Sequence, residues 1–393
     1  MGSDDIARIR REMARIPLSP PQAQALSALL EAAVAQPGGA DLLLAARRAR
    51  FGDPPLRFDR VAQPEAGDPS GQARAILSGL ALPDGLTPLA CLLPHLCQLP
   101  LLVDFYAEQG IDEPVLVDTL KDIPIWMEDY RAKHGVYGMA EADWLANHFS
   151  GGLFRLGRLQ FAFNRFEAGV ARLYTDGSRY AALAEAGLTV RRDGFLQGVC
   201  GLTDAHAFTT ALRDPGAQDG PWGYPVDVAT GRVLQPAASL GRPFQPALAA
   251  GDAVIDIHIP ADGPMDIAAC RAAFLQALDF FPRHFPAWPW RFFTCESWLM
   301  APQLPQLGNG NTAAFQRQFL ILPYDGGDEQ MFERLYQSDP ARDPAGLAAL
   351  PQGSSLQRAV RDHLLAGGLF TAMHGAIPRE LAAQFGQIAY RTR

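Results

Sequence analysis

An aspartate and a histidine stand two residues apart in the stretch 254–260, where they alternate with three isoleucines before a proline. Successive side chains of a β-strand point to opposite faces, so Asp256 and His258 share one face and the isoleucines share the other. The flanking sequence predicts a central strand, where a carboxylate and an imidazole need water, a partner or a catalytic role. Imidazole titrates near neutral pH, so His258 could take a proton from a substrate while Asp256 orients the ring or stabilises its charge. A structural pair that bonds neighbouring backbone is the alternative.

The segment Arg-Phe-Phe-Thr-Cys-Glu-Ser-Trp-Leu predicts a further strand and carries a second group of candidates. Glu296 would share a face with Thr294 and Trp298, whereas Ser297 would share the other face with Cys295. If one face lines a cleft, Glu296 is a candidate auxiliary base and Ser297 a candidate proton donor; simple packing gives the same pattern. Cys295 is more simply a small buried hydrophobe than a nucleophile.

Two arginines, Arg155 and Arg158, flank Gly157 in the stretch 153–163, which alternates apolar and polar residues as half-buried strands do. A guanidinium group binds carboxylate or phosphate through two parallel hydrogen bonds, so this pair could clamp an anion. Solvated or inter-domain salt bridges are the alternative.

The bulk composition narrows the class of protein. A chain of 393 residues is long for one core, so two domains are expected, and 48% apolar with 19% charged residues is an ordinary globular composition. The net charge of −8 gives no overall attraction to nucleic acid or to an anionic membrane, and neither partner is expected. The five cysteines are scattered and odd in number, which favours reduced thiols, no metal site and a cytoplasmic location.

The first third of the chain predicts a helical domain, residues 1–145. Helices are expected near 20–36 (capped by Ser19 and ended by Pro37), 41–50, 73–79, 88–109, 113–134 (kinked at Pro124) and 139–148. The most apolar window, 86–103, contains prolines and polar residues and predicts a buried helical hairpin rather than a membrane span. The polar, charged N-terminus does not resemble a signal peptide.

The remainder, residues 146–393, predicts a second domain in which helices and strands alternate. Irregular structure with short helices is expected over 164–222, one of them at 204–213, and a hairpin over 224–234. Further on we expect a helix over 265–281 that ends at Pro282, strands at 319–322 and 369–373, and helices at 311–319 and 356–366, the former capped by Asn309 or Asn311. The fold class is α/β (α+β): a helical N-terminal domain followed by a mixed β-sheet flanked by helices.

Four motifs add a family resemblance: 144–161, Val254–Pro264, Cys295–Leu299 and Leu350–Arg358. Together they resemble a bacterial family of acyltransferase-domain proteins with a helical N-terminal N-acyltransferase domain and a GNAT-like C-terminal domain. The resemblance covers roughly residues 90 to 380.

The resemblance implies a place for each candidate residue. In the GNAT fold the fourth strand and the helix after it hold the pantetheine and pyrophosphate of the donor, and the fourth and fifth strands splay to admit the thioester. Here these strands would be 254–259 and 292–298. Expected donor contacts are Ile257, Ile259, Asp262, Gly263, Met265 and Asn311, and expected substrate contacts are Arg155, Arg158 and Trp298. The usual glycine-rich phosphate loop is replaced by Asp-Gly-Pro, and Asp262 and Asp266 are also ordinary helix caps.

The implied function is N-acyl transfer from a thioester donor, acyl-CoA or the acyl-phosphopantetheine of an acyl carrier protein, to a small-molecule or peptide amine. His258 and Asp256 would handle the proton of the amine, Glu296 would assist, and Ser297 would protonate the thiol leaving group. One alternative is a catalytically inactive GNAT-like protein that binds a ligand or partner. Another is a metalloenzyme that uses Asp256, His258 and a distant His284 or His374, although the sequence has no dense ligand cluster. The sequence leaves the oligomeric state undetermined.

Overall fold

The computed structural model describes residues 2–53, 56, 58, 67–167, 169–213, 220–307 and 310–391 and divides into two compact units. The first unit comprises Met1–Asn164, His258–Pro264 and Asp279–Pro286, and the second comprises Arg165–Ile257, Met265–Leu278 and Ala287–Arg393. Two short segments from the second half of the sequence therefore pack with the first unit. The domain boundary between residues 145 and 146 stays a prediction.

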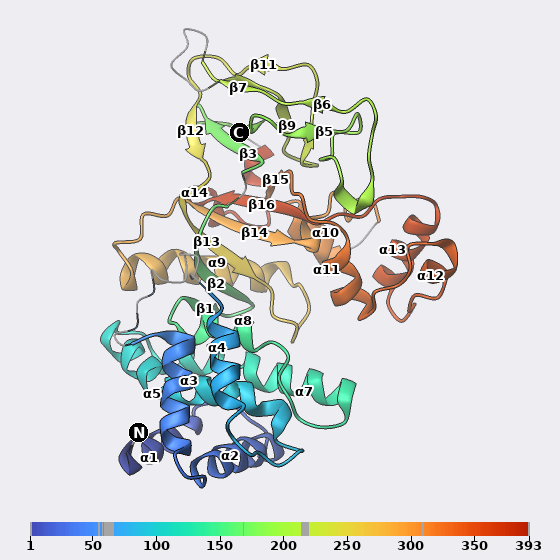
Figure 1. The fold of residues 1–393 in the computed structure, drawn as a ribbon. Coiled ribbons are helices and arrows are strands. Elements are labelled where there is room, and N and C mark those ends of the chain that lie inside the picture. The colour runs from blue at the N-terminus through green and yellow to red at the C-terminus, as the bar shows by residue number, and fades with distance from the viewer. Residues whose placement is uncertain are drawn as a thin grey trace. The chain divides into compact units, whose positions relative to one another are not determined.

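The first unit is mainly helical, as expected (Figure 1). Its helices are α1 (Ser3–Met13), α2 (Pro20–Val34), α3 (Gly39–Phe51), α4 (Pro69–Leu77), a 3-10 turn (Thr87–Leu92), α5 (Leu93–Glu108), α6 (Glu113–Thr119), α7 (Asp122–His134) and α8 (Ala142–Phe149). Helix α2 begins where the sequence predicts, because Ser19 and Gln22 form a capping box and a proline occupies the first turn.

Two details of the helical unit differ from expectation. The segment Thr87–Glu108 is apolar and long enough by composition to cross a membrane, but 72% of its apolar window is buried, as in a core helix. This segment runs as one helical stretch rather than as a hairpin. The break between α6 and α7 lies at Leu120–Lys121, and Pro124 sits in the first turn of α7, where its missing amide is tolerated.

A β-hairpin completes the first unit. Strands β1 (Leu153–Leu156) and β2 (Leu159–Arg165) pair antiparallel, with Leu153 opposite Ala162 and Leu156 opposite Leu159. Gly157 takes φ 62° in the tight turn, a conformation that favours glycine. Phenylalanines of the hairpin then pack on the end of helix α9, with ring centroids 5.0 Å apart for Phe154 and Phe280.

The second unit contains the predicted mixed sheet. Its strands follow the order β13 (Ala253–His258), β14 (Phe292–Ser297), β16 (Met373–Pro378) and β15 (Leu320–Leu322); β13 and β14 are parallel and the other pairs antiparallel. Helix α9 (Ile267–His284) packs Phe274 edge-on against Phe293 of β14. The helix continues past its predicted end, with Pro282 in its last turn.

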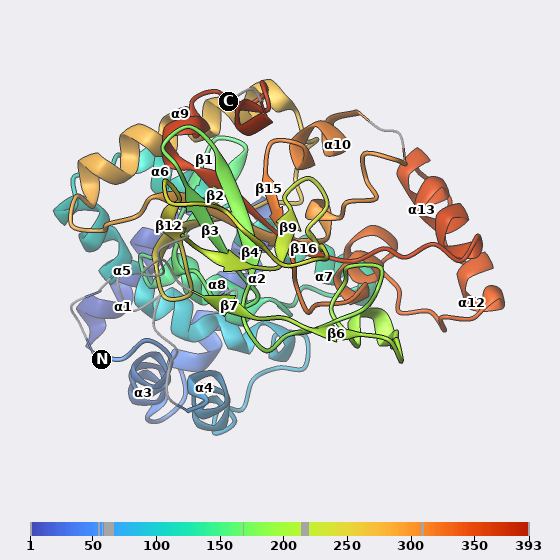
Figure 2. The ribbon, with the colours of Figure 1, turned by 90° about the horizontal axis from the view of Figure 1, so that it is seen from above.

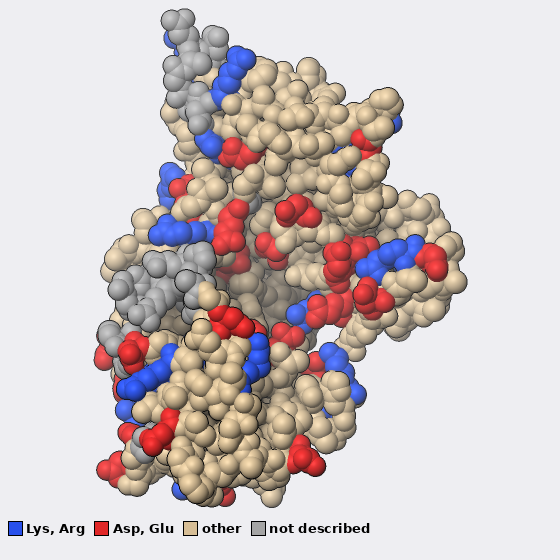
Figure 3. Space-filling model, in the orientation of Figure 1, with Lys and Arg blue, Asp and Glu red and all other residues tan. Residues whose placement is uncertain are grey.

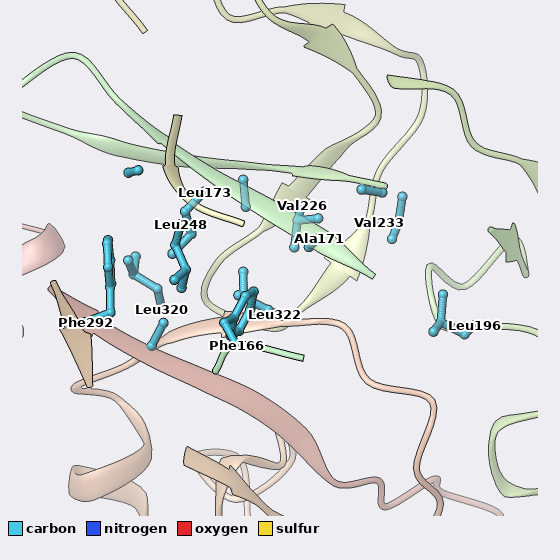
Figure 4. Packing of buried hydrophobic residues seen from close by; sticks show 14 of the residues in the cluster. Phe166, Ala171, Leu173, Leu196, Val226, Val233, Leu248, Phe292, Leu320 and Leu322 are labelled. Carbon is cyan, nitrogen blue, oxygen red and sulfur yellow. The ribbon is translucent and has the colours of Figure 1, made fainter. Parts of the chain in front are cut away.

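A second sheet of this unit was not predicted. It follows the order β10 (Arg232–Val233), β9 (Pro225–Asp227), β4 (Tyr180–Ala184), β3 (Ala171–Thr175) and β12 (Gln245–Leu248) (Figure 2). Strands β9 and β10 form the expected hairpin. Between this sheet and the mixed sheet, Leu173 and Leu248 pack with Phe292, Leu320 and Leu322 in one hydrophobic cluster (Figure 4).

The predicted helix at 204–213 is wrong. Its residues form two short strands, β6 (Phe208–Thr209) and β7 (Leu212–Arg213), because extended partners are available: β5 (Thr189–Val190) for β6 and β8 (Trp222–Gly223) for β7, with β11 (Ala238–Ser239) beyond β8. The last strand was predicted at 369–373, but only Met373 of that range is in it: β16 is Met373–Pro378, where β14 and β15 pair with it on both sides.

The remaining elements are short, and two of them overlap the helices predicted at 311–319 and 356–366. They are a 3-10 turn (Val199–Gly201), a 3-10 turn (Trp298–Met300), α10 (Gly310–Gln316), α11 (Glu329–Met331), a π-helical turn (Phe332–Tyr336), α12 (Pro344–Ala348), α13 (Ser355–Leu365), α14 (Arg379–Ala382) and a 3-10 turn (Ala389–Arg391). Helix α13 begins with a Ser354–Gln357 capping box and ends before Gly367, which takes φ 78°.

Candidate active site

The pairing of β13 with β14 ends part-way along the two strands. The registered pairs are Ile255 with Phe293 and Asp256 with Thr294, and the described chain has no further pair between these strands although β14 continues to Ser297. The backbone groups beyond this point are therefore released from that ladder. The divergence that the family resemblance implied between the fourth and fifth strands would begin at this point.

A buried carboxylate marks the end of the ladder. The Thr294 hydroxyl donates a hydrogen bond of 2.8 Å to Oδ1 of Asp256, and both side chains are at least nine-tenths buried. The bond satisfies part of the hydrogen-bonding capacity of a carboxylate that would otherwise be costly to bury.

Three more polar side chains continue this face of the sheet. Glu296 lies two residues after Thr294 and is paired in register with His374 of β16. Its Oε2 is 3.8 Å from Nε2 of His374, and its Oε1 accepts a hydrogen bond from the Tyr324 hydroxyl. The rings of Tyr324 and His374 meet edge-on, with centroids 4.7 Å apart. Asp256, Thr294, Glu296, His374 and Tyr324 thus form one group, which we call the polar row.

The protonation states within the polar row differ by environment. Burial lowers the pKa of His374, although the carboxylates of Glu296 and Asp256 oppose this effect, so the imidazole is neutral at pH 7. Burial and then Glu296 raise the pKa of Tyr324 well above its ordinary value, so the phenol keeps its proton. The row thus combines a neutral base with a protonated acid.

Cys295 and Ser297 lie beside the row on β14. Cys295 is buried, and burial, followed by the carboxylates of Asp256 and Glu296, raises the pKa of its thiol well above the ordinary value. A thiol that holds its proton so firmly is a poor nucleophile. The Ser297 Oγ accepts a hydrogen bond from the Leu299 amide and caps the following 3-10 turn. Trp298 belongs to that turn and not to the predicted strand.

His258 is the last residue of β13 and packs with the first unit. Its half-buried ring meets the edge of the Trp144 indole, with centroids 4.6 Å apart and an angle of 64° between the planes. Its predicted pairing with Asp256 stays a prediction.

The two candidate anion-binding arginines hold a turn of the protein itself. Arg155 forms an ion pair with Asp262 at 2.8 Å. Arg158 donates to the carbonyl oxygens of Pro260, Gly263 and Pro264 at 3.0, 2.6 and 2.8 Å. These bonds hold the Asp-Gly-Pro turn and agree with the salt-bridge alternative, while a substrate contact of the two arginines stays a prediction.

The expected donor contacts are placed as follows. The Ile257 side chain is 1% exposed, so only its backbone is available to a ligand, whereas Ile259 and Met265 are half-buried and Asp262, Gly263 and Asn311 are exposed. Asp266 caps α9, because its Oδ1 accepts from the Ala269 amide at 2.7 Å. Asn311 lies inside α10 and Asn309 lies outside the described residues.

A metal centre has no support in the described residues, where no group of three or more His, Cys, Asp or Glu side chains is arranged to hold an ion. His284, one of the candidate ligands, bonds the Gln109 carbonyl oxygen through Nδ1 at 2.9 Å. All five cysteines are free thiols.

Two family models match the chain in sequence. An N-acyltransferase N-terminal domain matches residues 7–151, and a GNAT-like C-terminal domain matches residues 153–377. The chain belongs to the GNAT-like N-acyltransferase family. This N-acyltransferase therefore moves an acyl group from a thioester donor to an amine acceptor, as the resemblance implied.

Solved structures show the same fold. An acyltransferase in complex with decanoyl-CoA is 21% identical, with a TM-score of 0.56 over 94% of this chain and 86% of that one. An acyltransferase in complex with decanoyl-CoA and teicoplanin is 21% identical, with a TM-score of 0.55 over 94% of this chain and 87% of that one. A mutant acyltransferase in complex with octanoyl-CoA is 20% identical, with a TM-score of 0.55 over 94% of this chain and 87% of that one. A comparison with curated proteins found no match.

Sequence reasoning missed Tyr324 and considered His374 only as a metal ligand. Tyr324 follows the buried triplet Leu320–Leu322 and Pro323, so its position just beyond a strand end was a usable signal. The pairing of His374 with Glu296 depends on strand register between segments almost eighty residues apart, which the sequence pattern does not contain.

Proposed function

We propose that this N-acyltransferase takes its acyl group from acyl-CoA and delivers it to the amine of a small molecule or peptide in the cytoplasm. The similar structures hold octanoyl-CoA, decanoyl-CoA or teicoplanin, which supports a CoA donor and an acceptor of moderate size. Five free thiols fit a reducing compartment.

The observation that carries the proposal is the polar row at the end of the β13–β14 ladder. In the reaction, the amine nitrogen bonds the thioester carbonyl carbon and the carbon–sulfur bond breaks. The nitrogen must lose protons before and during this step, and the departing sulfur must gain one. The site therefore needs a proton acceptor and a proton donor.

We assign the acceptor role to His258, with Asp256 two residues before it on the same strand. His258 is half-buried, whereas His374 is 8% exposed and packs edge-on to Phe166 and Tyr324. Glu296, which is exposed, would hold the ammonium group before it is deprotonated.

We assign the donor role to Tyr324. Its phenol is protonated because burial and Glu296 raise its pKa, so a proton is present for the sulfur as the carbon–sulfur bond breaks. Ser297 is the second candidate donor, since its oxygen accepts from Leu299 and its hydroxyl hydrogen remains to donate.

The charge around the row favours a cationic acceptor. The carboxylates of Glu296, Asp256, Asp325 and Glu167 all act electrostatically on His374. Asp and Glu side chains are also visible on the surface of the second unit in Figure 3, in a chain of net charge −8. A negative local potential concentrates an ammonium and disfavours an acceptor that carries a carboxylate, such as a free amino acid.

The test is turnover with defined donors. Purified protein is incubated with acetyl-, octanoyl- or decanoyl-CoA and a panel of amines, and free thiol is measured beside the mass of the N-acyl product. We expect thiol release that depends on the amine and matches product formation. Calorimetric binding of acyl-CoA without turnover would instead support the inactive ligand-binding alternative. Turnover with an acyl carrier protein and not with acyl-CoA would show that the carrier protein, rather than CoA, supplies the acyl group.

A further inference from the structure

A buried carboxylate organises the aromatic residues beside His258. Asp122, the first residue of α7, is 3% exposed, and its Oδ2 accepts a hydrogen bond of 3.0 Å from Nε1 of Trp144. The same oxygen lies 3.1 Å from Nε2 of His148. Burial alone would raise the pKa of Asp122, but hydrogen bonds from His148, Gln160 and Trp144 lower it to about 2. The carboxylate is therefore ionised and accepts from Trp144 and His148.

The hydrogen bonds fix the state of His148. An ionised carboxylate can only accept, so Nε2 of His148 carries a proton and donates to Asp122. Nδ1 is buried and has no hydrogen-bond partner among the described residues. The imidazole is fully buried and cannot reach a substrate. His148 therefore helps to hold Asp122 in place and has no direct part in proton transfer.

The network ends at the predicted general base. Trp144 and His148 are one helical turn apart on α8, so both lie on the face of α8 that meets Asp122. The hydrogen bond from Nε1 selects one orientation of the indole, and the indole meets the ring of His258 edge-on at 4.6 Å. Contacts thus run from Asp122 through Trp144 to His258, all within the first unit.

We propose that Trp144, held in orientation by Asp122, is a positioning residue for His258, an inference that rests on the proposed role of His258. Trp144 would restrict the imidazole to one ring orientation and so aim its basic nitrogen at the amine. A displacement of about 1 Å in a reacting group can cost about 100-fold in rate, so the packing of the Trp144 indole against His258 should strongly affect turnover.

The substitutions Trp144→Ala, Trp144→Phe and Asp122→Asn separate the parts of this network. Trp144→Ala removes the indole that packs against His258, and we expect kcat to fall by about 10- to 100-fold while KM for acyl-CoA stays within about twofold. Trp144→Phe keeps a ring and loses the N–H, so it should restore most of the kcat lost in Trp144→Ala. Asp122→Asn removes the charged acceptor, and its kcat should lie between those of Trp144→Ala and Trp144→Phe.

A matched control is Trp288→Phe. Trp288 is buried, and its Nε1 donates to the Val254 carbonyl oxygen of β13 at 3.1 Å. The substitution therefore also deletes an indole N–H hydrogen bond, and it does so at the strand that carries His258. We expect kcat to stay within about twofold of the unmodified protein, even if thermal stability falls by an amount similar to that of Trp144→Phe.

A direct readout of the His258 ring distinguishes positioning from stability. In protein labelled with ring-¹³C histidine, the His258 signal is assigned by its loss in His258→Asn. We expect Trp144→Ala to move this signal, since the indole ring current is lost, and Trp288→Phe to leave it in place. Normal kcat in Trp144→Ala, or an unmoved His258 signal, would overturn the positioning role. Normal turnover in His258→Asn would instead remove the proposed base itself, which is a separate failure.

Discussion

The Thr294 hydroxyl donates a 2.8 Å hydrogen bond to the Asp256 carboxylate at the last registered pair between β13 and β14. The two side chains come from parallel strands almost forty residues apart in sequence and share one face of the sheet. This bond therefore links the two strands at the point where their registered pairing ends.

Thr294→Val tests that bond, because it keeps the shape of the side chain and removes the donor. A buried carboxylate that loses a donor costs about 1–3 kcal/mol, so we expect the free energy of unfolding in urea to fall by that amount. We also expect kcat/KM for acyl-CoA to fall, since Asp256 lies at the site. Thr294→Ser, which retains a hydroxyl, should recover most of both losses; equal losses in the two variants would assign the effect to packing.

Tyr324→Phe tests the proton donor. General acid catalysis contributes about 10²- to 10⁴-fold, and we expect thiol release from decanoyl-CoA to slow within that range. The decrease should shrink when the donor is a thiophenyl ester, because an acidic thiol leaves without protonation. An equal decrease with both thioesters would show that Tyr324 is not the proton donor. Ser297→Ala would then be the variant to compare.

A buried histidine of the first unit should make stability depend on pH. Burial lowers the pKa of His95 to about 4, below its ordinary value of 6.5. Between these values the unfolded chain binds a proton that the folded chain does not, so stability is complete above about pH 6.5 and is lost as the pH falls towards 4. The expected loss is about 3 kcal/mol. Urea unfolding at pH 7 and pH 4.5 should show a smaller difference for His95→Gln than for the unmodified protein; the same difference would contradict the assignment.

Gly231 is required at the tip of the β9–β10 hairpin. It takes φ 71°, and a Cβ there would collide with Cε of Met373 and lie 3.0 Å from Cγ2 of Ile321. Gly231→Ala therefore combines backbone strain with overpacking, and we expect a loss of about 2–4 kcal/mol in unfolding experiments. Gly177→Ala is a matched control, since it takes φ 89° in a turn with open space around it, and it should cost only the backbone strain.

Strong local signals predicted much of the fold. The Ser19 cap and the following prolines located α2, the alternation of isoleucines with Asp256 and His258 located β13, and the Ala-Thr-Gly turn located the β9–β10 hairpin. Each is specified by a few neighbouring residues, so a single sequence is sufficient. The family resemblance supplied the arrangement of the strands that local patterns cannot give.

The strands that were missed depend on distant partners. Strand β3 pairs with β12, about seventy residues later, and the two-residue strands β6 and β7 are extended only because β5 and β8 lie beside them. In the site, Asp256 and Glu296 could be proposed from their strands, whereas His374 and Tyr324 required the register of β16 and the path of a loop. Arg155 and Arg158 were predicted to contact a substrate, and the sequence does not show that the 260–264 turn also accepts hydrogen bonds from them.

The most direct test of the account is N-acyl transfer itself, measured with His258→Asn beside the unmodified protein. With decanoyl-CoA and a cationic amine, we predict equal amounts of free CoA and N-decanoyl product by mass spectrometry, and a turnover in His258→Asn lower by about 100-fold or more. The controls Thr294→Ser and Trp288→Phe should stay close to the unmodified protein. Amine-dependent turnover that is undiminished in His258→Asn would contradict the proposed base, and acyl-CoA that binds without any transfer would contradict the central claim.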